Sequence, residues 1–366
     1  MELISHLVLV LAACLADGLI GDPVYGLHPI RLLGAWSLLW EKILSAGGLD
    51  GYLGGIIHWV LVVGAALLVW WALHHLLALW HPWAAWAWDA LIAYSLLCLR
   101  DLLAHGRRVL TSLDDLPAAR HRVAMLVGRD TAGLDRAGVV RATIESLAEN
   151  LTDGVLTPLW ALCLFGLPGL ILVKAVSSLD SMIGYRNHRY RRFGWAAARS
   201  DDLVHWLPAR LSVPLIALAA ALLRLHPLLA FNAARRWRRM LASPNSGWSE
   251  AACAGALRVR LIGPISYQGR VVNEAFMGDE DWPADLEGSH LDRALRLVLV
   301  CGLLAVGLGL ILGAPPALVP IPLLVRSFTL FCICGGRPPC RSASRSERHG
   351  GRSLPQSHVK RGTRSC

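Results

Sequence analysis

Apolar stretches long enough to cross a lipid bilayer recur along this chain, and they constrain its fold more than any other feature. A spanning helix needs about 20 mostly apolar residues. Residues 53–73 are interrupted only by His58, and residues 295–312 form a second such stretch. Charged residues make up only 17% of the chain, against about 25% in an ordinary soluble domain. The sequence therefore predicts an all-α, polytopic membrane protein with helical polar regions between apolar spans.

Composition divides the chain into four regions. Residues 1–99 contain apolar stretches at 3–20, 53–73 and 84–99, which predict N-terminal membrane helices. Residues 100–293 are mostly polar, with leucine and valine at helical spacing, and we interpret them as a helical catalytic region that includes a short apolar segment at 211–223. Residues 294–334 are predicted to hold the C-terminal membrane segment or segments.

The apolar stretch at 155–176 is interrupted at its centre. The sequence there reads Gly166-Leu-Pro168-Gly169, and proline with paired glycines breaks a helix. Broken membrane helices occur only where protein or a cavity covers the freed backbone groups. The sequence therefore predicts a broken or re-entrant segment that brings the polar residues on its two sides to the same face of the membrane.

The formal charge of +10 is concentrated at the C-terminus. Residues 337–366 hold eight Lys or Arg against the single acid Glu347, so the remaining chain is close to neutral and nucleic acid is not an expected partner. Residues 335–366 lack apolar periodicity and are predicted to form a disordered basic tail. The abrupt change of composition there resembles what a frameshift near the 3′ end of a coding sequence produces.

Three acidic side chains precede the interrupted stretch at helical spacing. Glu145, Glu149 and Asp153 follow one another at intervals of four, so a continuous helix would place them on one face. Like charges in a row repel unless a cation or a basic partner is present. Hard oxygen ligands of this kind suit a divalent metal with bound phosphate. The alternative is a solvated acidic face.

A second polar cluster follows the interrupted stretch. It combines acids with basic and hydroxyl groups, a mixture suited to binding both phosphate and a divalent metal. Its members are Lys174, Asp180, Ser181, Tyr185, Arg186, Asn187, Arg189, Tyr190, Arg199, Asp201, Asp202 and Arg210. A structural ion-pair network, with Lys174 extending toward the membrane interface, is the alternative.

A third cluster, Ser243-Pro-Asn245-Ser-Gly247, has turn chemistry. Asn and Gly in a turn can present backbone N–H groups to an anion. A plain turn without a ligand is the alternative interpretation.

Taken in order, these clusters resemble the adenosylcobinamide-phosphate synthases, membrane proteins of cobalamin biosynthesis. The matching stretches begin with Asp17-Gly-Leu-Ile-Gly-Asp22-Pro and His28-Pro-Ile-Arg31 and end with the third cluster and Gly263-Pro264. Between them lie Val127-Gly-Arg-Asp-Thr131, the acidic stripe, and the second cluster from Leu179 to Arg210. Two positions depart from the family pattern: Ser177-Ser178 stands where Asn-Thr is expected, and His205 stands where Asn is usual.

The resemblance implies amide formation between adenosylcobyric acid and aminopropanol or its phosphate, with ATP and Mg²⁺ and an acyl phosphate intermediate. Glu145, Glu149, Asp180, Asp201 and Asp202 are then expected to be catalytic, and Glu149, Asp153, Asp180 and Asp202 to hold the metal. The residues expected to bind substrate or phosphate are Arg129, Asn150, Lys174, Ser181, Tyr185, Arg186, Arg199, Arg210, Asn245 and Gly247.

The resemblance also implies a multi-pass protein of the cytoplasmic membrane. Its expected partners are the corrinoid, the aminopropanol substrate, the lipid bilayer and other membrane enzymes of the cobalamin pathway. The alternative function is a non-enzymatic membrane sensor or transporter of related architecture, which would also place charged groups between apolar spans.

Overall fold

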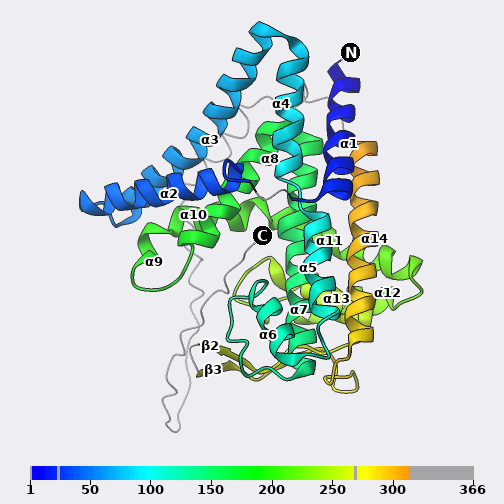
Figure 1. Ribbon diagram of the computed structural model, residues 1–366. Coiled ribbons are helices and arrows are strands. Elements are labelled where there is room, and N and C mark those ends of the chain that lie inside the picture. The colour runs from blue at the N-terminus through cyan, green and yellow to red at the C-terminus, as the bar shows by residue number, and fades with distance from the viewer. Residues whose placement is uncertain (1, 23–24, 268–269, 313–366) are drawn as a thin grey trace, which may run out of the picture.

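The computed structural model describes residues 2–22, 25–267 and 270–312, and it confirms the predicted all-α class (Figure 1). The helices are α1 (Glu2–Ile20), α2 (Pro29–Ala46), α3 (Tyr52–Trp80), α4 (Pro82–Ser95), α5 (Leu99–Leu110), α6 (Leu116–Ala124), α7 (Arg136–Asn150), α8 (Thr157–Ile183), α9 (Tyr190–Phe193), α10 (Trp195–Val204), α11 (Trp206–Leu222), α12 (Pro227–Trp237), α13 (Ser246–Leu257) and α14 (Gly288–Leu312). A π-helix, η1 (Leu151–Leu156), joins α7 to α8.

In the described part of the chain, strands occur only in the segment between α13 and α14. β1 (Leu261–Ile262) pairs antiparallel with β4 (Phe276–Met277), and β2 (Ile265–Tyr267) pairs antiparallel with β3 (Arg270–Asn273). These two short ribbons lie at the end of the molecule away from the free ends of α1 and α14 (Figure 1).

Four helical stretches among the described residues are long and apolar enough to cross a membrane: Tyr52–Trp80, Arg136–Ile183, Trp195–Leu222 and Gly288–Ile311. The predicted first span is present as α1, although its apolar part, His6–Ile20, is shorter than those four. The short apolar segment predicted at 211–223 is the end of a longer helical stretch, because α11 follows α10 almost directly. Residues 313–366, which include the predicted tail and the end of the predicted C-terminal membrane region, lie outside the described residues.

The break predicted within 166–169 is present at Gly166. This residue has φ 68° and ψ −165°, a conformation that is essentially restricted to glycine. Thr157 at the start of α8 and Ser177 near its end both lie 2.8 Å from the ring of His205. A straight helix would separate two residues 20 positions apart by about 30 Å. The two halves of α8 therefore form a hairpin, and its re-entrant placement in the membrane stays a prediction.

The hairpin joins two hydrophobic clusters. Its first half, including Leu162, and the residues just after the break, including Leu170, belong to a large cluster that also contains side chains of α7, α11, α13 and α14. Its second half, from Ala175 to Ile183, packs in a smaller cluster with α2, α3, α9 and α10. The polar residues at the base of the hairpin consequently lie where the two clusters meet.

The alternative interpretation of the acidic stripe as a solvated face is wrong. Helix α7 is buried along almost its whole length, and Glu145 is only 3% exposed. Helices α5, α13 and α14 cover it, so the acidic stripe is not a solvated face.

Candidate active site

A buried histidine lies at the centre of the predicted polar clusters. His205, which is 0% exposed, lies between α10 and α11. Its Nδ1 is 2.8 Å from Thr157 Oγ1 and 3.3 Å from Asp153 Oδ1. Its Nε2 is 2.8 Å from Ser177 Oγ and 3.1 Å from Asp201 Oδ1. The end of the acidic stripe and the second polar cluster thus meet on one imidazole ring.

The π-helix turns Asp153 toward this ring. A regular α-helix would continue the stripe from Glu145 through Glu149 to Asp153 along one face. The wider turn of η1, from Leu151 to Leu156, changes the angular position of Asp153 relative to the residues before it. Asp153 therefore approaches His205, whereas Glu145 approaches a different set of groups.

Asp180 and its neighbours extend the site along the second half of α8. Asp180 is buried one turn beyond Ser177, and Ser181 Oγ donates to the Ser177 carbonyl at 2.9 Å. Tyr185, just after the helix, lies close enough to Asp180 that burial and the carboxylate together raise the pKa of its phenol. At this end of the site, the buried carboxylate of Asp180 therefore lies close to the protonated phenol of Tyr185.

The third cluster is brought against the second by one hydrogen bond. Asn245 Nδ2 donates to the backbone carbonyl of Asp202 at 2.8 Å, and Asn245 is itself buried. The Asp202 carboxylate is partly exposed and lies 3.9 Å from Arg199 Nη1. The Ser243 hydroxyl accepts from the N–H groups of Asn245 and Ser246, so the turn satisfies those two donors internally.

An arginine-rich cavity of about 440 Å³ opens beside this turn. Arg210 lies over the rings of Trp206 and Trp248, with distances of 4.0 and 5.2 Å to their centroids. Arg238 lies 4.8 Å from the Trp248 centroid, and the remaining lining residues are Arg239, Leu241, Ala242, Ser243 and Pro244. Three guanidinium groups line this cavity, and none of the described residues that line it is acidic. This composition favours an anionic ligand.

Gly247 allows this wall to close. Its Cα lies directly against the backbone carbonyl of Arg238, where a side chain would collide with that oxygen. The glycine expected to present an N–H group to phosphate thus has a packing role that places Arg238 beside Trp248.

Glu145 lies apart from the His205 ring and holds two other parts of the chain. One carboxylate oxygen forms an ion pair with Arg129, and the other accepts the N–H of Ile262 at 2.7 Å. Ile262 has a positive φ of 65°, which is unfavourable for a β-branched residue. Glu145 therefore fixes the β1 strand and Arg129, which makes it a positioning residue in this arrangement.

The remaining predicted residues are less closely connected. Asn150 donates to the Ser146 carbonyl and hydroxyl on its own helix, Glu149 and Lys174 are half-buried, and Arg186 is exposed between α8 and α9. Within 2–22, 25–267 and 270–312, no group of three or more His, Cys, Asp or Glu side chains is arranged to hold a metal ion. The metal set Glu149, Asp153, Asp180 and Asp202 stays a prediction.

Sequence reasoning did not assign a role to His205, Thr157 or Arg238. His205 follows Asp201 by four residues, which on a helix places the two side chains on the same face, and this spacing was the available signal. Thr157 and Arg238 carry no comparable pattern, since their placement depends on the α8 hairpin and on the packing of α12 against α13.

Comparison with known proteins identifies the family. The family model described as "CobD/Cbib protein" matches residues 10–298. The chain belongs to the CobD/CbiB family. It is 38% identical over 308 residues to the cobalamin biosynthesis protein CbiB of Salmonella choleraesuis (strain SC-B67), covering 82% of this chain and 96% of that protein.

Two further relatives of this family are more similar over shorter alignments. The cobalamin biosynthesis protein CobD of Photorhabdus laumondii is 41% identical over 279 residues, covering 74% of this chain and 86% of that protein. The CobD protein of Geobacter metallireducens is 41% identical over 284 residues, covering 75% and 87% respectively. No solved structure gives a significant match.

Membership of the CobD/CbiB family gives the two departures from the family pattern a structural meaning. Ser177, where Asn is expected, and His205, where Asn is usual, contact each other at 2.8 Å. A short hydroxyl thus faces a large ring at the two positions that depart from the expected pattern.

Proposed function

We propose that this chain acts in cobalamin biosynthesis by joining a side-chain carboxylate of adenosylcobyric acid to aminopropanol or aminopropanol phosphate through an amide bond. Its family membership and its relatives' names support the pathway. The convergence of Asp153 and Asp201 on His205, beside an arginine-rich cavity, is the observation that supports an enzyme over a sensor or transporter. A sensor does not require several carboxylates buried in one polar site.

The chemistry needs an activated carboxylate, because an amine does not displace oxide from a carboxylate unaided. ATP would phosphorylate the corrinoid carboxylate, releasing ADP, and the amine would then attack the acyl carbon, release phosphate and lose a proton. Arg210, Arg238 and Arg239 are suited to bind the phosphate groups through charge-assisted hydrogen bonds. The buried carboxylates of Asp201 and Asp153 are suited to accept the proton from the amine.

The donor set fits Mg²⁺ only in part. Magnesium bound with a nucleotide typically uses one or two protein carboxylates, with phosphate oxygens and water completing its coordination. Asp202, next to Asp201, and Asp180, one turn beyond Ser177, are the carboxylates best placed to hold it at the edge of the His205 cluster. When bound, the ion would neutralise the charge of the phosphates.

The same proposal includes the setting of the enzyme. Four helical stretches of spanning length support a multi-pass protein, and we place it in the cytoplasmic membrane, where ATP and the corrinoid are accessible from one side. Its partners would be both substrates, the lipid bilayer and other membrane enzymes of the same pathway.

The test uses neutral variants that keep side-chain volume. Asp180→Asn, Asp201→Asn and Asp202→Asn should each lower product formation by at least about tenfold, since even changes around metal ligands reach that size. The first assay is growth of a strain lacking this step on cobyric acid compared with cobinamide. The second is ATP hydrolysis by detergent-purified protein with and without the corrinoid.

Asp114→Asn is the matched control, because Asp114 is an exposed carboxylate paired with Arg136 at 3.2 Å on the surface. It should grow like the parent protein. Full growth of the three site variants on cobyric acid, with membrane levels equal to the control, would exclude the catalytic role and favour a sensor or transporter.

A further inference from the structure

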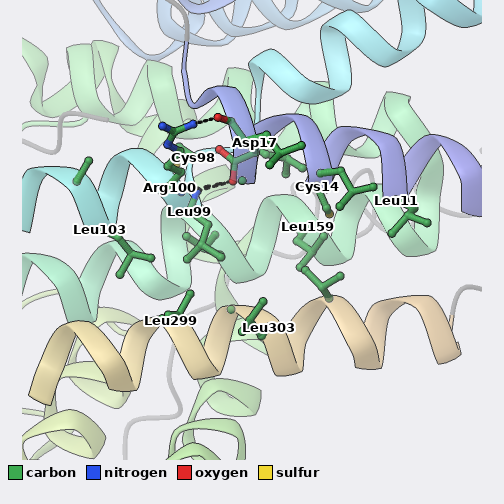
Figure 2. A pocket seen from close by; sticks show the side chains of 18 of the residues that line it. Leu11, Cys14, Asp17, Cys98, Leu99, Arg100, Leu103, Leu159, Leu299 and Leu303 are labelled. Atoms are coloured by element: carbon green, nitrogen blue, oxygen red, sulfur yellow. Dashed lines mark hydrogen bonds between the residues drawn. The ribbon is translucent and has the colours of Figure 1, made fainter.

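A second cavity, of about 710 Å³, lies on another side of the molecule, between α1, α5, α14 and the junction of η1 with α8 (Figure 2). Its charged lining consists of Asp17, Arg100, Arg107 and Arg108, and the other lining residues are almost all apolar. None of the residues of the proposed active site lines it. The cavity therefore needs an explanation of its own.

The apolar part of the cavity is formed by helices of the membrane region. Leu11 and Leu15 of α1, Leu159 of α8, and Leu303 and Val306 of α14 supply its walls. Figure 2 shows Leu159, Leu299 and Leu303 between the facing ribbons of α1 and α14, with Arg100 and Asp17 together at one side. An aliphatic chain fits such walls better than a polar solute does.

Arg107 and Arg108 lie at the opposite end of the cavity from Leu303 and Val306. The backbone of Gly302 lies against Leu99, where a Cβ would be 2.6 Å from Leu99 Cδ2, and Gly106 lies against Leu295 in the same way, at 2.8 Å. Helices α5 and α14 are thus antiparallel, and Arg107 and Arg108 lie level with Leu295. Just before Leu295, α14 carries the charged residues Asp292 and Arg293, so this level is the polar end of the helix.

The dimensions match one half of a bilayer. From the level of Leu295 to Val306, α14 rises about 16 Å at 1.5 Å per residue. One leaflet contributes about 15 Å of the hydrocarbon core. The distance from the basic end of the cavity to its far apolar walls therefore matches the distance from a lipid headgroup to the end of its acyl chains.

The charges of the acidic and basic side chains that line the cavity do not sum to zero, because one aspartate faces three arginines. Asp17 accepts the N–H groups of Leu99 and Arg100, at 3.1 and 3.4 Å, and Arg100 donates to the carbonyl of Leu19. These contacts hold α1 against the start of α5. Arg107 and Arg108 are exposed, and they leave a net positive charge at the polar end.

We propose that this cavity binds an anionic phospholipid, with its phosphate at Arg107 and Arg108 and one acyl chain between α1, α8 and α14. Charge complementarity at one end and leaflet-length apolar walls at the other select this ligand over a zwitterionic lipid or a free anion. The site is independent of the proposed enzymatic activity.

Native mass spectrometry of the detergent-purified full chain tests the proposal, with phosphatidylglycerol and phosphatidylcholine added at equal concentration. We expect one retained phosphatidylglycerol. Arg107→Gln combined with Arg108→Gln should lower its occupancy about tenfold, since each basic residue at an anionic surface contributes to binding. Leu303→Trp, which fills the apolar part, should lower it similarly.

Two matched controls separate this site from general lipid contact. Arg191→Gln with Arg192→Gln removes an adjacent exposed pair on α9, and Leu308→Trp changes an exposed position of α14 outside the cavity. Both should retain the lipid. The proposal would be overturned if the protein retained the two lipids equally, or if the control variants lost phosphatidylglycerol as much as the cavity variants do. It would also be overturned if the protein bound inorganic phosphate and Leu303→Trp left that binding unchanged.

Discussion

At the scale of single residues, the hydrogen bonds around His205 determine which ring nitrogen carries a hydrogen. The Thr157 hydroxyl donates to the Thr152 carbonyl at 2.9 Å, so it can only accept from His205. The Nδ1 atom of His205 therefore carries a hydrogen, which lies between Thr157 and Asp153. Ser177, whose hydroxyl faces Nε2, is then the group that adapts to the ring.

The contact between Ser177 and His205 leads to a coupled prediction. His205→Asn alone shortens the side chain, leaves buried partners unsatisfied, and should destabilise the protein by about 1–3 kcal/mol. Adding Ser177→Asn restores the amide pair of the family pattern, and we expect most stability and growth on cobyric acid to return. Thermal unfolding in detergent and the growth assay measure both effects. Additive losses in the double variant would contradict the coupling.

At the scale of elements, the α8 hairpin depends on one backbone conformation. Gly166 has φ 68° and ψ −165°, which a residue with a Cβ adopts only with strain. Gly166→Ala should destabilise the protein by about 1–3 kcal/mol. Gly64→Ala on α3 is the control, because a Cβ there meets open space. Equal unfolding temperatures for the two variants would show that the break tolerates a side chain.

The hairpin also predicts the membrane topology of the residues on its two sides. In a background without native cysteines, His121→Cys and Asn187→Cys, both at exposed positions, should react with an impermeant maleimide from the same side of the membrane. A segment that crossed once would place them on opposite sides. Labelling from opposite sides would therefore rule out a re-entrant arrangement.

These elements also show what sequence could predict. Proline and glycine are local signals, so the break in α8 could be located from the sequence to within a few residues. The π-helix and the convergence on His205 could not, because they depend on contacts between residues such as Thr157 and Ser177, which only the hairpin brings together. For the same reason, the contacts of Glu145 with Arg129 and Ile262 could not be predicted, and its catalytic role, which the family resemblance implies, stays a prediction.

At the scale of the whole molecule, the described core ends with α14. Among the residues that the structure describes, which end at 312, the two hydrophobic clusters and the side chains that pack on them extend to Leu310, and the family match ends at residue 298. Residues 337–366 have no apolar periodicity with which to join either cluster. Deleting them should keep growth on cobyric acid within about twofold.

A longer truncation provides the comparison. Ending the chain after residue 299 also removes Cys301 and Ala305, which are buried in the larger cluster, and should abolish accumulation in the membrane. Immunoblotting of membrane fractions with an N-terminal tag measures both variants. A complete loss of growth with the shorter deletion, at normal membrane levels, would contradict the prediction.

The position of the α8 hairpin has a consequence for biogenesis. His6 of α1 donates to the Cys163 carbonyl at 3.1 Å, and the backbone of Gly309 in α14 packs directly on the Cys163 side chain. The middle of the chain is thus enclosed by its first helix and its last. At the usual speed of a ribosome, Gly309 follows Ile183 by about 6 to 25 s. During that interval the hairpin can already pack against α1, α2 and α3, but its α14 side is uncovered. The nascent protein therefore passes through a stage in which one face of its centre has not yet met its partner helix.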